Sequence, residues 1–248
     1  MKLLLLITIL TTQYLFATIS IVPVEIGENP GTHGKVGASL ETKRGNTHKD
    51  NYKAALRVGY DNNISFVTWA EISGEYGESH DVEDTNKAFL HFRYIHALTE
   101  ETIRAELFAQ TQEDKFKSIE RRRIGGGGLR FRLFEIFENG KGYLGLGGYH
   151  ENIKYTDENP TEHDVRLNSY FAYTINFSED SSFSYTFYYQ PIYNYLNDFV
   201  TAHKMELKLH IYQELFLQFK VSYDFDSRPP IGILEDDFTQ TTEFVFNF

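Results

Sequence analysis

Arginine and lysine side chains recur at even spacings along several segments of the chain. Arg130 and Arg132 lie two positions apart, and Lys204 and Lys208 lie four apart. In a β-strand, such positions share one face. A face that carries guanidinium and ammonium groups attracts anions. We predict that basic side chains line the interior of a barrel, whose strands are derived below. They are Lys53, Arg57, Arg93, Arg104, Arg130, Arg132, Arg166, Lys204 and Lys208, with Lys35, Lys87 and Lys220 in the same phase.

Fewer acidic residues share that phase. The whole chain nevertheless carries a net charge of −11, so we expect the surplus negative charge in the connections. A net-positive interior predicts a narrow passage for small, preferentially anionic solutes. The alternative is a lattice of ion pairs that fills the interior and seals it. The inward acidic set expected from the phase is Glu41, Glu71, Glu106, Asp164, Glu206, Glu214 and Glu243.

Two further groups of charges lie near the ends of the expected strands. Arg121 and Arg123, with Lys115 and Lys117, could contact lipopolysaccharide phosphates, because Arg suits phosphate recognition; the alternative is a solvated basic patch. Oxygen ligands suit divalent cations, but acidic connections are more often simply solvated. The candidates for a metal site are Asp224, Asp226, Asp236 and Asp237, with Glu235 beside them.

Histidine and nucleophile placement does not point to an enzyme. His80, His150 and His163 each precede an acidic residue, but neighbours along a strand point to opposite faces. We find no nucleophile–base arrangement of the kind that an outer-membrane lipase would need, and we predict neither catalytic residues nor a cofactor. The pI near 5.3 argues against a nucleic-acid partner.

The elements that must position these side chains are strands. Within residues 201–212, Met205, Leu207 and Leu209 alternate with polar neighbours, and residues 213–223 and 165–177 follow the same period of two. Strict alternation is typical of strands whose two faces meet different surroundings. We count about twelve such segments of roughly 9–14 residues, which suits a membrane-crossing β-barrel. The expected starts are Gly34, Asn51, Asn63, Thr85, Glu101, Glu120, Lys141, His163, Ser181, Thr201, Gln213 and Asp237.

The connections are expected to alternate between short and long. Short turns at residues 61–62, 98–100, 138–140, 178–180 and 212–213 separate longer polar stretches, among them residues 77–84 and 194–200. Outer-membrane barrels have short periplasmic turns and longer external loops. We therefore predict an all-β, transmembrane, antiparallel up-and-down barrel of about twelve strands over residues 34–248.

The first residues look like a secretion signal. A basic start at Lys2, the apolar residues 3–10 and the small Ala17 predict a cleavable signal peptide over residues 1–17. A short periplasmic segment, residues 18–33, would follow. Cysteine is absent, which excludes a disulfide scaffold and a thiol nucleophile. Together these features predict export to the bacterial outer membrane.

The last strand and the glycine run complete the pattern. Phe244, Phe246 and Phe248 share one face at the end of the chain, as in the terminal signal that the barrel assembly machinery reads. Residues 125–128 are all glycine and continue into a strand, so we expect a bend or close backbone approach there instead of a phosphate loop.

The chain carries a set of short motifs at residues 34–40, Arg44-Gly45-Asn46-Thr47, residues 57–60, Tyr223-Asp224, Pro229-Pro230, Gly232 and Asp236-Asp237. Together these motifs resemble the YdiY-like salt-induced outer membrane proteins, also called domain of unknown function 481. The resemblance spans roughly residues 34–248. It implies an outer-membrane barrel and supplies no catalytic residues; it leaves open a channel, a sealed structural or envelope-stress barrel that responds to salt, and, less favoured, a lipid-modifying enzyme. Outer-membrane lipids and lipopolysaccharide are the implied partners.

Overall fold

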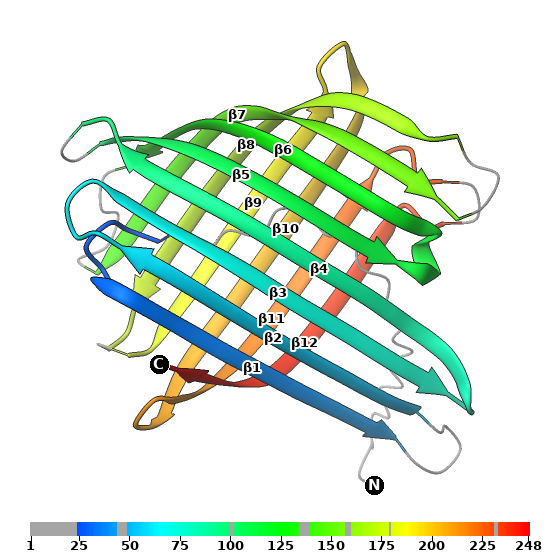
Figure 1. Ribbon diagram of the computed structural model, residues 1–248, viewed down its shortest axis with the longest axis horizontal. Coiled ribbons are helices and arrows are strands. Elements are labelled where there is room, and N and C mark those ends of the chain that lie inside the picture. The colour runs from blue at the N-terminus through cyan, green and yellow to red at the C-terminus, as the bar shows by residue number, and fades with distance from the viewer. Residues whose placement is uncertain are drawn as a thin grey trace, which may run out of the picture.

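Twelve antiparallel strands close into one barrel in the computed structural model (Figure 1). The structure describes residues 24–43, 49–99, 102–133, 139–156, 160–178, 180–230 and 233–248. The expected signal peptide, residues 1–17, lies outside the described residues, as do residues 18–23 of the segment expected to follow it. The prediction of an all-β up-and-down barrel with about twelve strands is confirmed.

The strands follow one another around the barrel in chain order. They are β1 (Gly31–Lys43), β2 (Lys49–Asp61), β3 (Phe66–Ser79), β4 (Val82–Ala97), β5 (Ile103–Asp114), β6 (Ile119–Arg132), β7 (Gly140–Tyr155), β8 (Glu162–Asn176), β9 (Ser182–Ile192), β10 (Tyr195–Tyr212), β11 (Leu215–Asp226) and β12 (Asp236–Asn247). A three-residue 3₁₀ helix, η1 (Lys115–Lys117), joins β5 to β6. Among the described residues, no helix is long and apolar enough to span a membrane.

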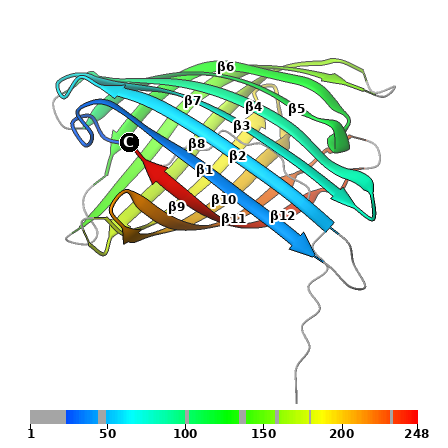
Figure 2. The ribbon, with the colours of Figure 1, turned by 60° about the horizontal axis from the view of Figure 1, so that its bottom comes forward.

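The first and last strands pair to close the barrel. Lys35 of β1 lies opposite Asn247 of β12, and Ala38 lies opposite Phe244. Backbone hydrogen bonds in both directions between Gly34 and Phe248 extend this seam. The start of β1 and the end of β12 therefore lie on the same side of the barrel, which we call the terminal end (Figure 2). The opposite side is the distal end.

The alternation of the sequence becomes an apolar exterior and a polar interior. Val36, Leu56, Ile72 and Leu107 are exposed on the outside of their strands. Their neighbours, such as Arg57 beside Leu56 and Glu106 beside Leu107, point inward. The exterior is thus built from aliphatic and aromatic side chains, as a lipid-facing wall requires.

Several strands are longer than the sequence pattern indicated. β10 has 18 residues and begins at Tyr195, so the external loop expected at residues 194–200 is mostly strand. β3 and β4 run on to a tight turn at His80 and Asp81, both with positive φ. A membrane crossing needs only about ten residues per strand, so the distal wall continues beyond that length. Because residues 77–84 and 194–200 are mostly strand and not long loops, the expected strict alternation of short and long connections is wrong.

The glycine run lies where two strands come unusually close. A Cβ at Gly126 would lie 2.4 Å from the carbonyl oxygen of Gly148, and one at Gly128 would lie 2.5 Å from that of Leu146. On β7, a Cβ at Gly145 would meet the ring of Tyr170. The expected close backbone approach is confirmed, and it makes room for large side chains inside the barrel.

Candidate functional site

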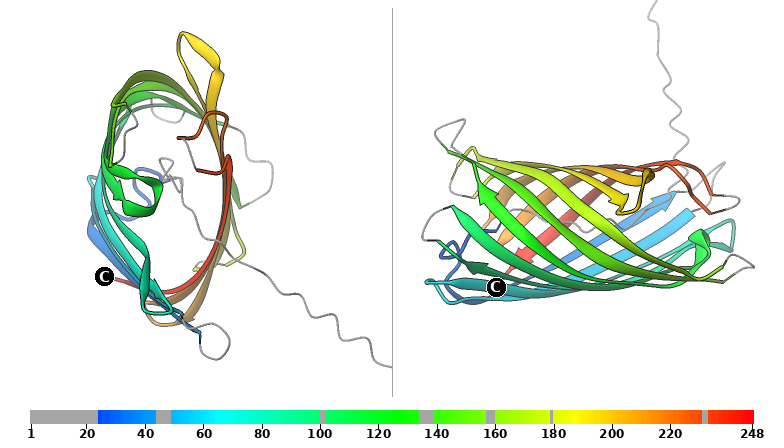
Figure 3. Two further views of the ribbon diagram at one scale, coloured as in Figure 1. Left: turned by 90° about the vertical axis from the view of Figure 1, so that its right-hand side faces the viewer. Right: turned by 90° about the horizontal axis from the view of Figure 1, so that it is seen from above.

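The candidate site is the barrel interior, which Figure 3 shows end-on inside the ring of strands. At its centre, Glu106 of β5 is enclosed by two guanidinium groups. Arg130 Nε lies 2.5 Å from one carboxylate oxygen, and Arg93 lies 3.5 Å from the other. Tyr170 donates its hydroxyl to the same carboxylate at 2.8 Å. All four side chains are buried, so this network occupies interior space beside β4, β5, β6 and β8.

A second chain of ion pairs lies toward the distal end. Arg166 donates to Glu151 at 2.8 Å and reaches Asp198 at 3.2 Å, and Arg122 pairs with the other oxygen of Glu151. Arg228 reaches Asp198 at 3.7 Å. These residues line a cavity of about 620 Å³, the distal cavity, and most of its charged side chains are paired with one another.

The turn between β5 and β6 folds over the distal mouth. Asp114 caps η1 by accepting from the backbone N–H groups of Phe116 and Lys117. Lys117 is buried and donates to Asp237 of β12 at 2.7 Å. Burial lowers the pKa of Lys117 to about 8, although Asp237 and Asp114 act to raise it.

A third region, the lysine cavity, lies against β1, β2 and β9–β12. Its volume is about 230 Å³, which is room for several waters or one small solute. Five basic and three acidic side chains line it, a surplus of two positive charges. Arg57 pairs with Glu71 at 2.8 Å, and Lys220 pairs with Glu243. The charged lining residues are Lys35, Lys53, Arg57, Glu71, Lys204, Glu206, Lys220 and Glu243.

Residues 24–28 lie within the terminal mouth. Val24 and Ile26 pack on the inward cluster of Val67, Trp69 and Ile95. Glu25 accepts from the hydroxyl of Tyr143 and pairs with Lys141 at 3.2 Å and Arg132 at 3.5 Å. Burial raises the pKa of Glu25, but the Tyr143 hydrogen bond and the two cations outweigh it and hold that pKa below 4.5.

The predicted cationic lining residues lie on the inward face, but in different surroundings. Arg93, Arg130 and Arg166 are buried in ion pairs, whereas Lys53, Arg57 and Lys204 line the lysine cavity. Arg132 is at the terminal mouth, and Arg104 donates to the carbonyl of Thr99 in a terminal-end turn. Lys208 lies over the ring of Phe216, 3.8 Å from its centre.

The interior as a whole is not net-positive in the way we expected. Carboxylates expected in solvated loops or missed altogether point inward because the strands run on. They are Glu75, Asp114, Glu151, Glu162, Asp198, Asp224, Asp226 and Asp237. The lysine cavity has a positive surplus, while the distal cavity has nearly balanced charge.

The four predicted phosphate contacts do not form one patch. Arg123 is exposed and Arg121 is half-buried, both on the outer face of β6. Lys115 is exposed and pairs with Glu83 at 2.5 Å. Lys117, by contrast, is buried in its pair with Asp237, so it cannot contact a phosphate outside the barrel. That part of the prediction is wrong, because η1 turns its last residue inward.

The predicted acidic cluster is also divided between two faces. Asp224 and Asp237 are cross-strand neighbours and both are buried, whereas Asp236 is exposed. Asp226 is buried near the distal cavity. Within the described ranges, no group of three or more His, Cys, Asp or Glu side chains could hold a metal ion.

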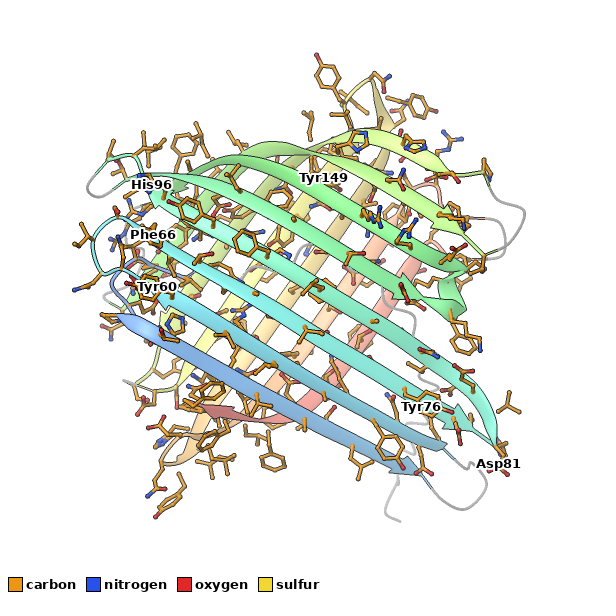
Figure 4. All side chains as sticks on the ribbon, in the orientation of Figure 1. Tyr60, Phe66, Tyr76, Asp81, His96 and Tyr149 are labelled. Atoms are coloured by element: carbon orange, nitrogen blue, oxygen red, sulfur yellow. The ribbon has the colours of Figure 1, made fainter. Side chains whose placement is uncertain are left out.

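Aromatic residues mark both the end of the chain and the terminal rim. Phe244, Phe246 and Phe248 are exposed on the outer face of the seam. Tyr60 and Phe66 lie together at the terminal end, 6.0 Å between ring centres, and Phe66 also contacts Tyr94 at 5.5 Å. Figure 4 shows Tyr60, Phe66 and His96 at this end and Tyr76 and Asp81 at the other.

Sequence reasoning missed several residues of the interior. Arg122 was not assigned to it, although it lies on the same face of β6 as Arg130, eight positions away. Its even spacing from Arg130 was a usable signal. Asp198 gave no such signal, since it lies near a register shift in β10.

Three solved structures are similar to this chain. An outer membrane channel from Pseudomonas putida F1 is similar with a TM-score of 0.55 at 11% identity, over 94% of this chain and 100% of that chain. The NanC porin has a TM-score of 0.48 at 13% identity, over 87% and 97% of the two chains. The KdgM porin, in complex with disordered oligogalacturonate, has a TM-score of 0.41 at 12% identity, over 87% and 96%.

At these identities the likeness concerns the fold alone. Among curated proteins, none matches the chain. The family described as protein of unknown function, DUF481, matches residues 36–248. Because that match extends over nearly the whole barrel, the chain belongs to the DUF481 family.

Proposed function

We propose that this barrel lies in the bacterial outer membrane and forms a narrow channel that favours small anionic solutes. The closed barrel and its apolar exterior support the location, since open sheet edges are not tolerated in lipid. The terminal end would face the periplasm, as in bacterial barrels with an even number of strands. A cleaved signal peptide over residues 1–17 remains part of this proposal.

The lysine cavity is the single observation that carries the anion preference. Lys35 and Lys53 line it and make neither an ion pair nor a hydrogen bond with the part of the chain that the structure describes. Charged rings that are not neutralised by neighbours set the sign of the ions that a pore admits. Ser184, Thr186 and Thr241 add hydroxyl groups to the same lining.

The second candidate is a sealed structural barrel, which the resemblance would connect to envelope stress and salt. Three features favour it, because each occupies space inside the barrel. They are the buried network around Glu106, the ion pair between Lys117 and Asp237 at the distal mouth, and the segment 24–28. A barrel of twelve strands lies between the filled eight-stranded barrels and the open sixteen-stranded porins.

We do not propose an enzyme. The contact between Ser79 Oγ and His80 Nδ1 measures 3.5 Å and lies at an exposed turn, which is too long for a strong hydrogen bond. Arg121, Arg123 and Lys115 stay candidates for lipopolysaccharide phosphates, and Phe244, Phe246 and Phe248 for the assembly machinery.

Planar-bilayer recordings of the refolded protein across a KCl gradient test the proposal. The wild type should give a reversal potential of the sign expected for chloride preference. Replacing both Lys35 and Lys53 by Gln should bring the ratio of chloride to potassium permeability close to that of free diffusion. Lys154→Gln removes an exposed cation on the outside, paired with Glu120, and should leave the ratio unchanged.

Two results would count against the channel. Absence of conductance in correctly folded protein would favour the sealed barrel. Conductance with no change of permeability ratio in the double variant would remove the lysine cavity as the selective region.

A further inference from the structure

The segment 24–28 runs along the inner wall of the terminal mouth, and in Figure 3 it lies inside the ring of strands. At one end the backbone N–H of Gly27 donates to Asp61 of β2 at 2.7 Å. On the other side the carbonyl of Val24 accepts from Arg130 of β6 at 3.1 Å. The segment therefore crosses the inner wall from β2 to β6 and narrows this mouth.

Glu25 is the residue of this segment that contacts all three donors of a group on the wall, whereas Glu28 reaches only one of them, Lys141, at 3.6 Å. Arg132 and Tyr143 are directly opposite each other in the ladder between β6 and β7. Lys141 lies two positions before Tyr143, on the same face. Their contacts with the Glu25 carboxylate are the Tyr143 hydrogen bond and the Lys141 and Arg132 ion pairs.

These three donors are positioned by the barrel and not by the segment. Their backbones are fixed by the ladder hydrogen bonds of β6 and β7, so the three donors would stay in place if Glu25 left them. A phenol, an ammonium and a guanidinium around one point form a site for a carboxylate, with charge-assisted hydrogen bonds. The Lys141 and Arg132 side chains are each about 30% exposed, so the site is reachable from solvent.

We infer that Arg132, Lys141 and Tyr143 form a binding site for small carboxylate anions at the terminal mouth, with Glu25 as its built-in competitor. A carboxylate that enters the site displaces Glu25 from it. The site is separate from the lysine cavity, whose lining does not include these residues. It does not depend on whether the barrel conducts.

Calorimetric titration of the refolded full chain with sodium acetate, at constant ionic strength, tests this inference. Glu25→Gln removes the competing charge with little change in shape. We expect it to bind acetate about tenfold more tightly than the wild type, because a hydrogen bond to a charged group contributes enough to shift a constant by that factor. Glu235→Gln, an exposed acid at the distal end, is the matched control and should behave as the wild type.

The same background tests the donors. Adding Arg132→Gln and Lys141→Gln to Glu25→Gln should abolish acetate binding, while gel migration that shifts on heating verifies that each variant is folded. Equal acetate affinity in Glu25→Gln and the wild type would overturn the inference. So would full binding in the triple variant.

Trp69 gives a second readout of the displacement. It is the only tryptophan of the chain, it is 3% exposed, and Val24 and Ile26 pack against the cluster that contains it. Acetate should raise the quenching of Trp69 by acrylamide in the wild type, and chloride at equal concentration should do so much less. Identical quenching in the two salts would show that Glu25 is not displaced by carboxylates. Because neither readout needs ion flow, a barrel without conductance can still pass this test.

Discussion

Lys117 and Asp237 lie 120 positions apart in the chain, and their side chains meet at 2.7 Å inside the distal mouth. Each side chain is only 2% exposed. In the order of the barrel, β12 lies opposite the β5–β6 connection that carries Lys117. The pair therefore bridges the mouth and connects the inward-folded turn to the opposite wall.

Loss of Lys117 should destabilise the barrel more than loss of the whole pair. Lys117→Met leaves the buried Asp237 carboxylate without this partner, and breaking a buried pair costs about 3–5 kcal/mol. Lys117→Met combined with Asp237→Asn should recover most of the loss, because two neutral groups need no counter-charge. Urea unfolding in lipid vesicles measures both. A double variant as unstable as the single one would contradict this explanation.

Glu106 should be the most sensitive carboxylate of the interior. Glu106→Gln leaves the buried Arg93 and Arg130 without their counter-charge, and we expect a loss of about 3–5 kcal/mol in the free energy of unfolding. Glu206→Gln is the matched control, since Glu206 lines the lysine cavity without a direct ion pair among the described residues. It should change the unfolding free energy by less than about 1 kcal/mol.

The period of two was sufficient to predict the barrel and the inward face of most cationic residues. Leu56 and Arg57, for example, are neighbours in β2, and they point to the exterior and the interior of the barrel, respectively, as the alternation predicts. The phase is a local property of the backbone, so it can be deduced without knowing which strands pair.

Strand ends and inward carboxylates could not be deduced in the same way. Toward the distal end the alternation breaks down and no longer marks a strand: Tyr195 and Leu196 precede Asn197 and Asp198 in β10, and His80 lies in a polar run between β3 and β4. Asp226 and Asp237 were therefore assigned to solvated loops. The contact of Lys117 with Asp237, like that of Glu25 with Lys141, depends on how the barrel closes, which no local spacing encodes.

Two glycines offer a test of the close packing between β6, β7 and β8. A Cβ at Gly145 would lie 1.9 Å from the Tyr170 ring, so Gly145→Ala must move the tyrosine that donates to Glu106. Overpacking of this kind costs about 1–3 kcal/mol. Gly125→Ala has no atom within 4 Å of its new methyl group and should be nearly neutral. Urea unfolding of both variants compares them, and equal stabilities would contradict the packing described above.

Acid should release the segment 24–28 from the terminal mouth. The pKa of Glu25 lies below its ordinary 4.5, because the Tyr143 hydrogen bond, Lys141 and Arg132 outweigh the effect of burial. A carboxyl whose pKa is lower in the docked state favours docking above its ordinary pKa, and this contribution is lost as the pH falls through the lowered value. Docking should thus be constant above about pH 4.5 and weaken below it.

Fluorescence of Trp69 can follow that change, since Val24 and Ile26 pack against its cluster only while the segment is docked. In the wild type the emission should move to longer wavelength as the pH is lowered below 4.5. Glu25→Gln should lose this transition, because its amide does not titrate, while Glu235→Gln should keep it. A transition of the same size in Glu25→Gln would mean that another group controls the docking, and the ion pairs of Glu25 with Lys141 and Arg132 would then not be what holds the segment in place.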